Sequence, residues 1–464
     1  LTPEEVRILT TWVREGADWG EHWSFISPVA KPLPEPSNPA WAKQSLDRLI
    51  LARLDAEELA PTKPASPAEW LRRASFDLTG LPPSASELRN FESALSGPGG
   101  EEAAYGEVAD RLLGSPAFGE RWATVWMDLA RYADTKGFEK DPHRNTWPYR
   151  DWLIRAFNTD MPFDQFTIKQ LAGDLLPAGS PDDLVATVFH RNTMANTEGG
   201  TDDEEFRVAA VIDRINTTWT VWQASTFGCV QCHDHPYDPF RQEEYYQFMA
   251  FFNSTEDCDL DNDFPNYRLP PDPKEAQRAL ALEREARALR EHLNTPGRRL
   301  ASGLENWTPF VPDELNPSHG ELTIDSDKRI RVSGTIPTRS RYVLTAPATP
   351  IQALRLEIFP ESDRATDWPE RGSVASQVAL QLVRPDGTRQ AVPLREVFAD
   401  HLGGPYEPAA SLRKGAAGFG GYPKLFGPRW AVFVPEAPAD PPAGSRFILT
   451  IHQQATTTGA VSYT

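Results

Sequence analysis

The spacing of the apolar residues changes near Asn306, and this change constrains the fold more than any other feature of the chain. Before Asn306 the apolar residues recur with the period of amphipathic helices, whereas after it they form short alternating or continuous runs of strand length. The sequence therefore predicts an α+β multidomain chain, in which a mainly helical domain is followed by an antiparallel β-sandwich.

Local signals place individual elements within these two parts. Helix starts are indicated at Thr2, where a capping hydroxyl precedes a proline, and at Ser66 and Ser84, each followed three residues later by glutamate. Further helices are predicted over the ranges Ser45–Leu59, Ala103–Leu113, Gly119–Tyr132, Trp147–Asn158, Phe163–Leu171 and Glu204–Phe227. The charged segment Pro273–Leu293 predicts a solvated connector helix. Strands are predicted over Glu321–Val332, Arg341–Thr345, Leu354–Phe359, Val378–Val383, Trp430–Val434 and Phe447–His452.

The pentapeptide Cys229-Val230-Gln231-Cys232-His233 has the spacing of a c-type haem attachment site. Each thiol can add to one vinyl group of the same porphyrin, and the adjacent imidazole can then bind the iron. The same pattern also serves as a redox dithiol or as half of a zinc site. With only three cysteines in 464 residues, a four-thiolate zinc site is excluded, but a mixed site with two histidines stays open. We expect covalent haem c at Cys229 and Cys232, with His233 as an iron ligand.

The second axial ligand of such an iron has two candidates. His190 and Met194 lie four residues apart, so on a helix they would share a face. Methionine would raise the reduction potential, and histidine would lower it relative to methionine. The structural alternatives are a hydrogen-bonded core histidine and a packing methionine.

Three other polar groups admit a site or a structural role. The acidic run 256–263 alternates carboxylates as calcium loops do, but it lacks the glycine and the final glutamate of an EF-hand, and a solvated loop is the alternative. His235 is compatible with a contact to a haem propionate, with a second metal site together with Asp234 and Asp238, or with a polar turn. Arg207 and Arg214 suit haem propionates or salt bridges with Glu204, Glu205 or Asp213.

The charge of the chain limits its partners. The net charge of −19, from 66 acidic and 47 basic residues, argues against nucleic acid or an anionic membrane surface as the main partner. It suits a basic redox partner protein, or solubility alone. No apolar run approaches the length of a membrane span, so we expect no transmembrane segment.

Several motifs together resemble a known family. They are Asp128–Ala133, Tyr149–Trp152, Gln170–Asp174, His190–Asn192, Glu198–Gly200, Asp213-Arg214 and Cys229–His235. With them the chain resembles the cytochrome-like helical domain of large secreted proteins of planctomycetes and verrucomicrobia. That domain is known as a domain of unknown function or as planctomycete cytochrome c domain two. The resemblance is strong over 120–252 and weak after 306.

The resemblance implies a domain plan. Residues 1–25 would be the tail of an upstream cytochrome-like domain, and 26–265 the helical haem c domain. Residues 266–300 would be a connector helix, and 301–464 a carbohydrate-binding-like β-sandwich. Further domains upstream and downstream would belong to a longer protein. The family brings no settled reaction.

Two functions from different classes remain. The first is a secreted haem protein in electron transfer or oxidation, linked to polysaccharide use, and whether it turns over a substrate stays open. The second is an extracellular glycan-binding protein with a structural Cys-x-x-Cys-His site, in which Trp307, Trp368 and Trp430 are either a sugar platform or core. Covalent haem attachment takes place outside the cytoplasm, so we expect a periplasmic or extracellular location.

Overall fold

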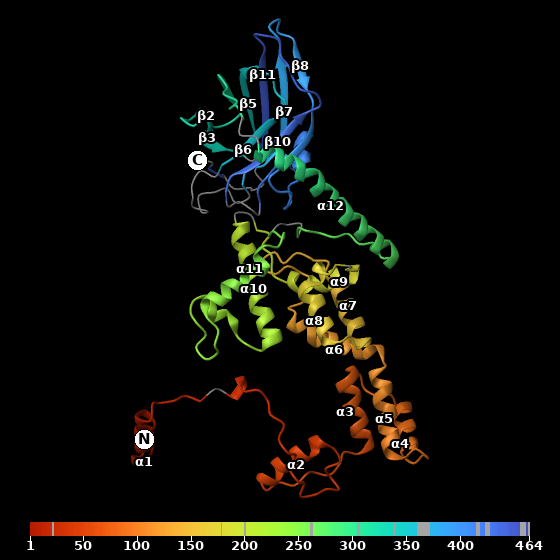
Figure 1. Cartoon of the computed structure of the whole chain (residues 1–464). Helices are drawn as coiled ribbons and strands as arrows, with labels where there is room; N and C mark the ends of the chain where they lie inside the picture. The colour runs from red at the N-terminus through yellow and green to blue at the C-terminus, as the bar shows by residue number, and fades with distance from the viewer. Residues whose placement is uncertain are drawn as a thin grey trace. The chain divides into compact units, whose positions relative to one another are not determined.

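A computed structural model provides the fold (Figure 1). It describes residues 1–20, 23–177, 179–198, 201–259, 263–303, 307–337, 339–359, 372–413, 418–422, 427–454 and 461–462. Gly199, Gly200, Trp368 and residues 260–262 of the acidic run lie outside these ranges. Helices occupy the chain up to Gly303 and antiparallel strands follow, which confirms the predicted α+β multidomain layout.

The chain divides into two compact units, and each is described by itself. The first unit comprises 1–73 and 83–97, and the second comprises 74–82 and 98–464. The first unit contains α1 (Pro3–Arg14), η1 (Trp23–Phe25), α2 (Ser45–Ala56), the start of α3 (Pro67–Thr79) and α4 (Ala85–Leu95). Its buried apolar residues include Leu51, Leu71 and Phe91, and the ring of Trp70 lies 5.4 Å from that of Phe91.

The helix starts form as the sequence predicts. The Thr2 hydroxyl accepts a hydrogen bond from the Glu5 amide, and the Glu5 carboxylate accepts one from the Thr2 amide. Ser84 and Glu87 make the same reciprocal pair, at 3.2 and 2.7 Å. These pairs satisfy amide groups that the first turn of a helix leaves without a partner.

The second unit begins with helices and short 3₁₀ turns. They are α5 (Gly100–Leu113), α6 (Pro116–Leu129), α7 (Trp147–Asn158), α8 (Phe163–Ala172), η2 (Gly173–Leu175), α9 (Pro181–Ala186), η3 (Thr187–Arg191), α10 (Asp203–Gln223), η4 (Phe227–Gln231), α11 (Gln242–Asn253) and α12 (Pro273–Gly303). Helix α10 ends before the predicted Phe227, because Ala224 adopts a left-handed conformation with φ of 51°. Among the described helices, none has the length and apolar character needed to cross a membrane.

Two apolar clusters organise the helical region. The first joins α6, α7 and α8 and includes Trp152, Leu153 and Phe166. The second joins α10, η4 and α11, and its buried members are Val211, Ile215, Phe227, Val230 and Tyr245. The cysteine motif begins on η4, so the second cluster positions its first residues.

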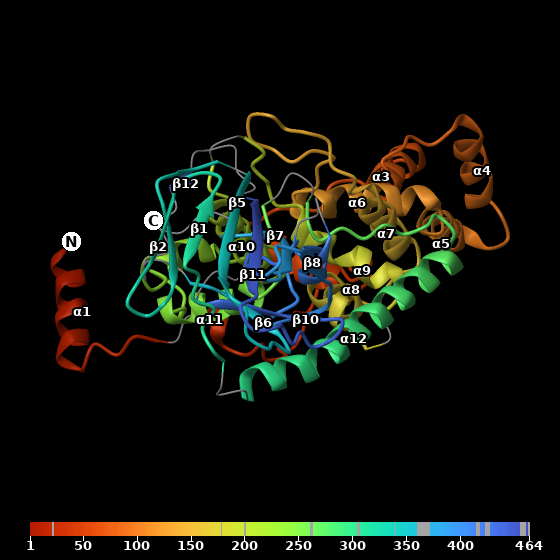
Figure 2. The ribbon, with the colours of Figure 1, turned by 90° about the horizontal axis from the view of Figure 1, so that it is seen from above.

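Eight of the described strands form a sandwich of two antiparallel sheets, and the pairs β2-β3 and β4-β12 form two small sheets of their own. One sheet has the order β1-β5-β11-β7-β8 and the other the order β6-β10-β9. The strands are β1 (Glu314–Pro317), β2 (Glu321–Ile324), β3 (Ile330–Ser333), β4 (Thr335–Ile336), β5 (Arg339–Pro347), β6 (Leu354–Ile358), β7 (Ala375–Val383), β8 (Arg389–Val392), β9 (Leu394–Ala399), β10 (Arg429–Pro435), β11 (Arg446–Gln454) and β12 (Val461–Ser462). Figure 2 shows β5, β11 and β7 side by side, as their pairing requires.

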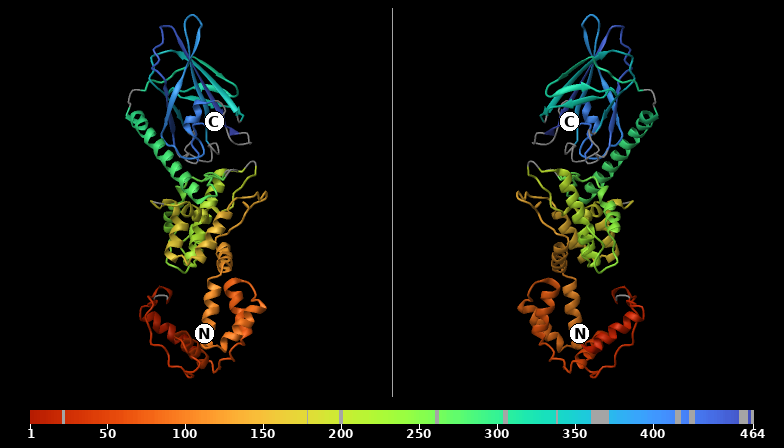
Figure 3. Two further views of the ribbon diagram at one scale, coloured as in Figure 1. Left: turned by 90° about the vertical axis from the view of Figure 1, so that its right-hand side faces the viewer. Right: turned by 90° about the vertical axis from the view of Figure 1, so that its left-hand side faces the viewer.

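The core of the sandwich lies between its two sheets. Leu344, Leu380 and Phe447 come from the larger sheet, and Ala431 and Phe433 from the smaller one. Figure 3 shows the strands from two opposite sides. The predicted run Glu321–Val332 is in fact a hairpin of β2 and β3, whereas the other predicted strands match single strands of the structure.

Helix α12 is longer and more closely packed than a solvated connector. It continues through Pro296 to Gly303, and Ala276 and Leu280 near its start are buried. Near its other end, the side chain of Asn294 donates to the carbonyl oxygen of Ala399 and accepts from the amide of Ala399, both at 2.9 Å. Alternating charge predicted the exposed face of this helix but not these contacts.

Candidate functional site

The cysteine motif begins on the 3₁₀ turn η4, which contains Cys229 and is followed directly by Cys232 as its C-cap, and two apolar side chains anchor this turn. Phe227 and Val230, three positions apart, are buried in the cluster between α10 and α11. This anchoring leaves Cys229 half-buried and Cys232 exposed, and both are free thiols. The turn closes with a 3.2 Å hydrogen bond from the Cys232 amide to the Cys229 carbonyl oxygen. The two thiols therefore lie on one short turn at the surface.

His233 follows the turn with its ring held in one orientation. Its Nδ1 lies 2.7 Å from the carbonyl oxygen of Asp234. Because a carbonyl oxygen can only accept, Nδ1 carries the proton, and in the neutral ring Nε2 keeps a free lone pair. Imidazoles that bind metals commonly donate their other ring N–H to such an acceptor, which fixes the tautomer.

His235 has a structural role. Its Nδ1 accepts hydrogen bonds from the amides of Tyr237 (3.2 Å) and Asp238 (2.8 Å), so this side chain stabilises the turn. In the part of the chain that the structure describes, no three His, Cys, Asp or Glu side chains gather as metal ligands. The described side chains around the motif thus form neither the mixed zinc site nor a second metal site at His235.

Residues of helix α11 donate hydrogen bonds to the end of the motif turn and to the residues that follow it. The carbonyl oxygen of Gln231 accepts from the Tyr246 hydroxyl at 2.9 Å and from the Gln242 side-chain amide at 3.1 Å. The Gln242 backbone amide also donates to the Asp234 carboxylate at 2.8 Å. These bonds hold the end of the turn, and hence Cys232 and His233, against α11.

Three buried polar atoms beside the turn have no hydrogen-bond partner among the residues that the structure describes. They are Asn216 Oδ1, Trp219 Nε1 and Tyr245 Oη. The Asn216 amide lies about 3.4 Å from where a Cβ on Gly228 would be. The Trp219 and Tyr245 rings lie 4.2 and 5.2 Å from the Phe227 ring. An unpaired buried polar group costs about 1–3 kcal/mol, so three of them round one turn indicate where a bound group would supply partners.

These observations fit a covalently attached haem. The turn supplies two accessible thiols and an imidazole with Nε2 available, and the adjacent helices supply aromatic rings and unpaired polar atoms. Cys229, Cys232 and His233 would hold the group.

The two candidates for a second axial ligand lie in different settings. The 3₁₀ turn η3 ends at Arg191, so His190 and Met194 do not share a helix face. Met194 is 58% exposed and its side chain covers Gly137.

The ring of His190 lies 4.7 Å from that of Phe252. Both ring nitrogens are buried, and in the described part of the chain neither makes a well-formed hydrogen bond. Burial lowers its pKa to about 3, with Arg214 and Arg131 adding to the effect and the Leu171 backbone opposing it. His190 therefore stays neutral.

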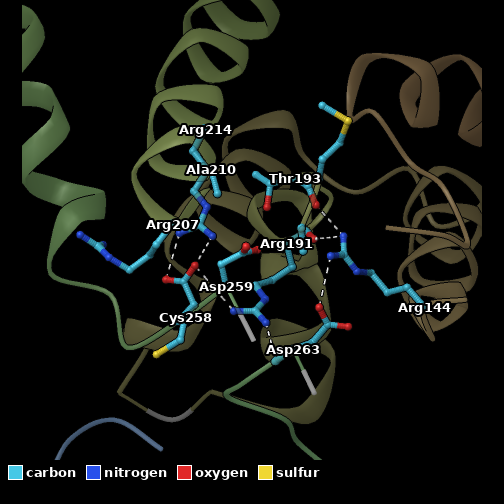
Figure 4. Close-up of a pocket in the computed structure, with 12 residues that line it drawn as sticks. Arg144, Arg191, Thr193, Arg207, Ala210, Arg214, Cys258, Asp259 and Asp263 are labelled. Carbon is cyan, nitrogen blue, oxygen red and sulfur yellow. Dashed lines mark hydrogen bonds and ion pairs between the residues drawn. The ribbon is translucent and has the colours of Figure 1, made fainter. Parts of the chain in front are cut away.

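A second polar feature is a pocket lined by four arginines and three aspartates (Figure 4). Its charged residues are Arg144, Arg191, Arg207, Arg214, Asp257, Asp259 and Asp263. The space open to the centre of a water molecule is about 20 Å³, enough for one or two waters but not for a sugar or a porphyrin.

Most of the charges in this pocket are paired with one another. Arg214 donates to both carboxylate oxygens of Asp257, and Asp263 pairs with Lys136 at 3.1 Å and Arg144 at 3.2 Å. Arg207 pairs with Glu204 at 2.8 Å, one of the salt bridges that the sequence offered as an alternative to a propionate. The partner of Arg214 was not among those offered. The network ties the segment after α11 to the helices.

The acidic run thus contributes to this network. The pKa of Asp257 is far below its usual value, because the effect of Arg214 and Arg191 outweighs the opposing effect of burial. The pKa of Asp259 is raised to about 7 by burial and by the nearby Asp203 and Asp263 carboxylates. The described carboxylates of the run face separate partners and do not converge as calcium ligands do.

The comparison with known families concerns the helical region. Residues 45–257 match the family PSCyt2, described as a protein of unknown function (DUF1549). The PSCyt2 region includes the motif turn, the hydrogen bonds that α11 donates to it and the three unpaired atoms. The sandwich lies outside this region. No curated protein and no solved structure matches the chain.

Sequence reasoning found the thiols and the imidazole but missed the residues around them. Tyr245 and Tyr246 belong to an aromatic run that carries no recognisable site motif. Asn216 and Trp219 lie on a helix with no motif of their own, and only the fold brings them to the turn.

Proposed function

We propose that the PSCyt2 region carries a haem attached through thioether bonds to Cys229 and Cys232, with His233 as an iron ligand. Each thiol S–H would add across one vinyl double bond, a step that needs no external oxidant. Electron transfer or an oxidation at the iron is the activity that such a group supplies.

One observation carries the proposal more than any other. His233 directs its Nδ1 proton to the Asp234 carbonyl and leaves Nε2 free, on a turn that also presents two free thiols. A redox dithiol needs no oriented imidazole, and a tetrahedral zinc site needs ligands that converge. The arrangement supports haem over both alternatives.

The exposure of the motif favours electron exchange with another protein. Cys232 and His233 lie at the surface, and the segment that follows includes the exposed acids Asp234 and Glu243. We propose a basic redox partner that docks near this turn, since opposite charges speed such encounters. Covalent haem also implies maturation in the periplasm or outside the cell.

A glycan-binding role has less support. A sugar platform needs an exposed aromatic face, but Trp307 and Trp430 are partly buried and lie against the guanidinium of Arg355. We therefore assign neither polysaccharide binding nor calcium, and the sandwich remains a structural part of the proposal.

A visible spectrum tests the proposal. The chain would be produced with and without the machinery for c-type haem attachment, and its spectrum recorded oxidised, reduced and after acid–acetone extraction in alkaline pyridine. We expect a Soret band that survives extraction, is kept in part when Cys229→Ser or Cys232→Ser leaves one thioether, and is lost in the double variant. Cys258→Ala, at a buried thiol outside the motif, is the control. A colourless wild-type chain from cells that attach haem to another cytochrome would overturn the proposal.

A further inference from the structure

Helix α12 presents an apolar stripe to solvent. Its members recur at alternating intervals of three and four residues, and they are Ala279, Leu282, Ala286, Leu289 and Leu293. Leu282, Leu289 and Leu293 are 55%, 54% and 66% exposed, although large apolar side chains are normally covered. This spacing is the heptad pattern of a coiled coil, in which apolar residues fill the first and fourth positions of each group of seven.

The contacts of α12 with its own chain use a different side of the helix. Ala276 and Leu280 are buried, and Arg284 donates to the Gly179 carbonyl oxygen at 2.7 Å. Asn294 binds the backbone at the end of β9. With 3.6 residues per turn, the centre of these contacts lies about 130° round the helix from the centre of the apolar stripe. The stripe is therefore accessible to another molecule while α12 stays packed on its own chain.

The charged residues that flank the stripe match a parallel copy of the same helix. In a parallel pair of heptad helices, the seventh residue of one heptad faces the fifth residue of the next heptad on the partner. Arg278 would thus face Glu283 of the second copy, and Glu285 would face Arg290, so every pair joins opposite charges. Among the described residues, Arg278, Glu283 and Glu285 form no ion pair within the chain. Arg290 has only an exposed pair with Glu407, at 3.8 Å.

We propose that α12 forms a short parallel coiled coil with α12 of a second copy of this chain, with Leu282 and Leu289 at its centre. The inference goes beyond the proposed function and does not depend on haem. The same stripe supplies both sides of the contact, as a two-fold interface requires. Burial of the leucines drives the association, and the flanking charges select the parallel direction. Helix α12 already forms in the single chain, so the association needs no new helix.

Sedimentation of the full chain, with its thiols kept reduced, tests the pairing. The concentration would run over about 1 to 100 µM, because so small an interface should bind in the micromolar range at best. We expect a reversible change from one to two chains per particle as the concentration rises. Leu289→Gln should weaken this association about tenfold or more. Ala288→Gln, at an exposed position of α12 outside the stripe, is the matched control and should leave the association unchanged.

A charge exchange tests the parallel direction. Glu285→Arg and Arg290→Glu should each weaken the association, because each places like charges opposite one another. The double variant restores opposite charges and should associate almost as the wild type does. In an antiparallel pair these two positions lie on opposite sides of the seam, so no such rescue would occur.

Three results would overturn the inference. They are a wild-type chain that stays single over the whole range, an association that Leu289→Gln leaves as strong as before, and a double charge variant that associates no better than the single ones. Each of them would leave the proposed haem function standing, since the haem-free chain serves for every measurement.

Discussion

Arg214 on α10 and Asp257, 43 positions along the chain, form an ion pair whose side chains are only 3% and 9% exposed. The pair fastens the segment after α11 to α10, the helix that also carries Trp219. Helices α10 and α11 flank the motif turn, so this ion pair helps to hold the walls of the proposed haem site.

Asp257→Asn should destabilise the protein strongly. It leaves the buried charge of Arg214 without its carboxylate, and breaking a buried pair in this way costs about 3–5 kcal/mol. The free energy of unfolding, from urea titration of the haem-free chain, measures the loss. Asp182→Asn is the control, because its pair with Arg155 is largely exposed and should contribute less than about 1 kcal/mol. Equal losses in the two variants would show that the pocket network does not support the fold.

His233→Gly should remove an iron ligand without preventing the covalent attachment of haem. The thioethers at Cys229 and Cys232 should still hold the haem, while the iron loses the imidazole that the Asp234 carbonyl orients. We expect a changed visible spectrum that added imidazole restores, and the same imidazole should leave the exposed control His143→Ala unaffected. A spectrum unchanged by His233→Gly would remove this residue from the iron.

The sequence predicts elements well where the signal is local. The Ser84 capping box forms and α7 spans the predicted Trp147–Asn158, because a cap and a helical stripe depend on residues a few positions apart. Helix α11 was missed, since the aromatic residues of Tyr245–Phe252 form an almost continuous apolar run with weak helix propensity.

The residues of the candidate site also divide into those that a local sequence signal predicts and those that it does not. The thiols and His233 follow from spacing alone, whereas the partners of Asp257 and the position of Trp219 depend on contacts between distant segments. The shared face of His190 and Met194 assumed a continuing helix, but η3 ends at Arg191. Spacing predicts a common face only when the helix that carries it forms.

Asp259 should make stability depend on pH in the neutral range. Its pKa is about 7 in the folded protein, whereas an unfolded aspartate titrates near 3.9. Between these values the folded state holds a proton that the unfolded state has released, so rising pH favours unfolding. The loss begins near pH 4, is complete above about pH 7 and amounts to about 4 kcal/mol at most.

Asp259→Asn should remove that pH dependence. The amide cannot ionise, yet its oxygen can still accept the hydrogen bond from the Asn196 amide. Urea unfolding from pH 4.5 to pH 8 should therefore show a flatter profile for the variant, which gains on the wild type as the pH rises. Parallel profiles would mean that Asp259 titrates normally.

Asn294→Ala should loosen the packing of α12 on the sandwich. The Asn294 side chain is the partner of both the N–H and the C=O of Ala399 at the end of β9, and its loss leaves two buried backbone groups unpaired. We expect a loss of about 2–4 kcal/mol in the free energy of unfolding and faster proteolysis near α12. Glu291→Ala is a control on the same helix, because its exposed pair with Arg298 should contribute less than about 1 kcal/mol. If both variants were cleaved at the wild-type rate, α12 would be a connector that the sandwich does not need.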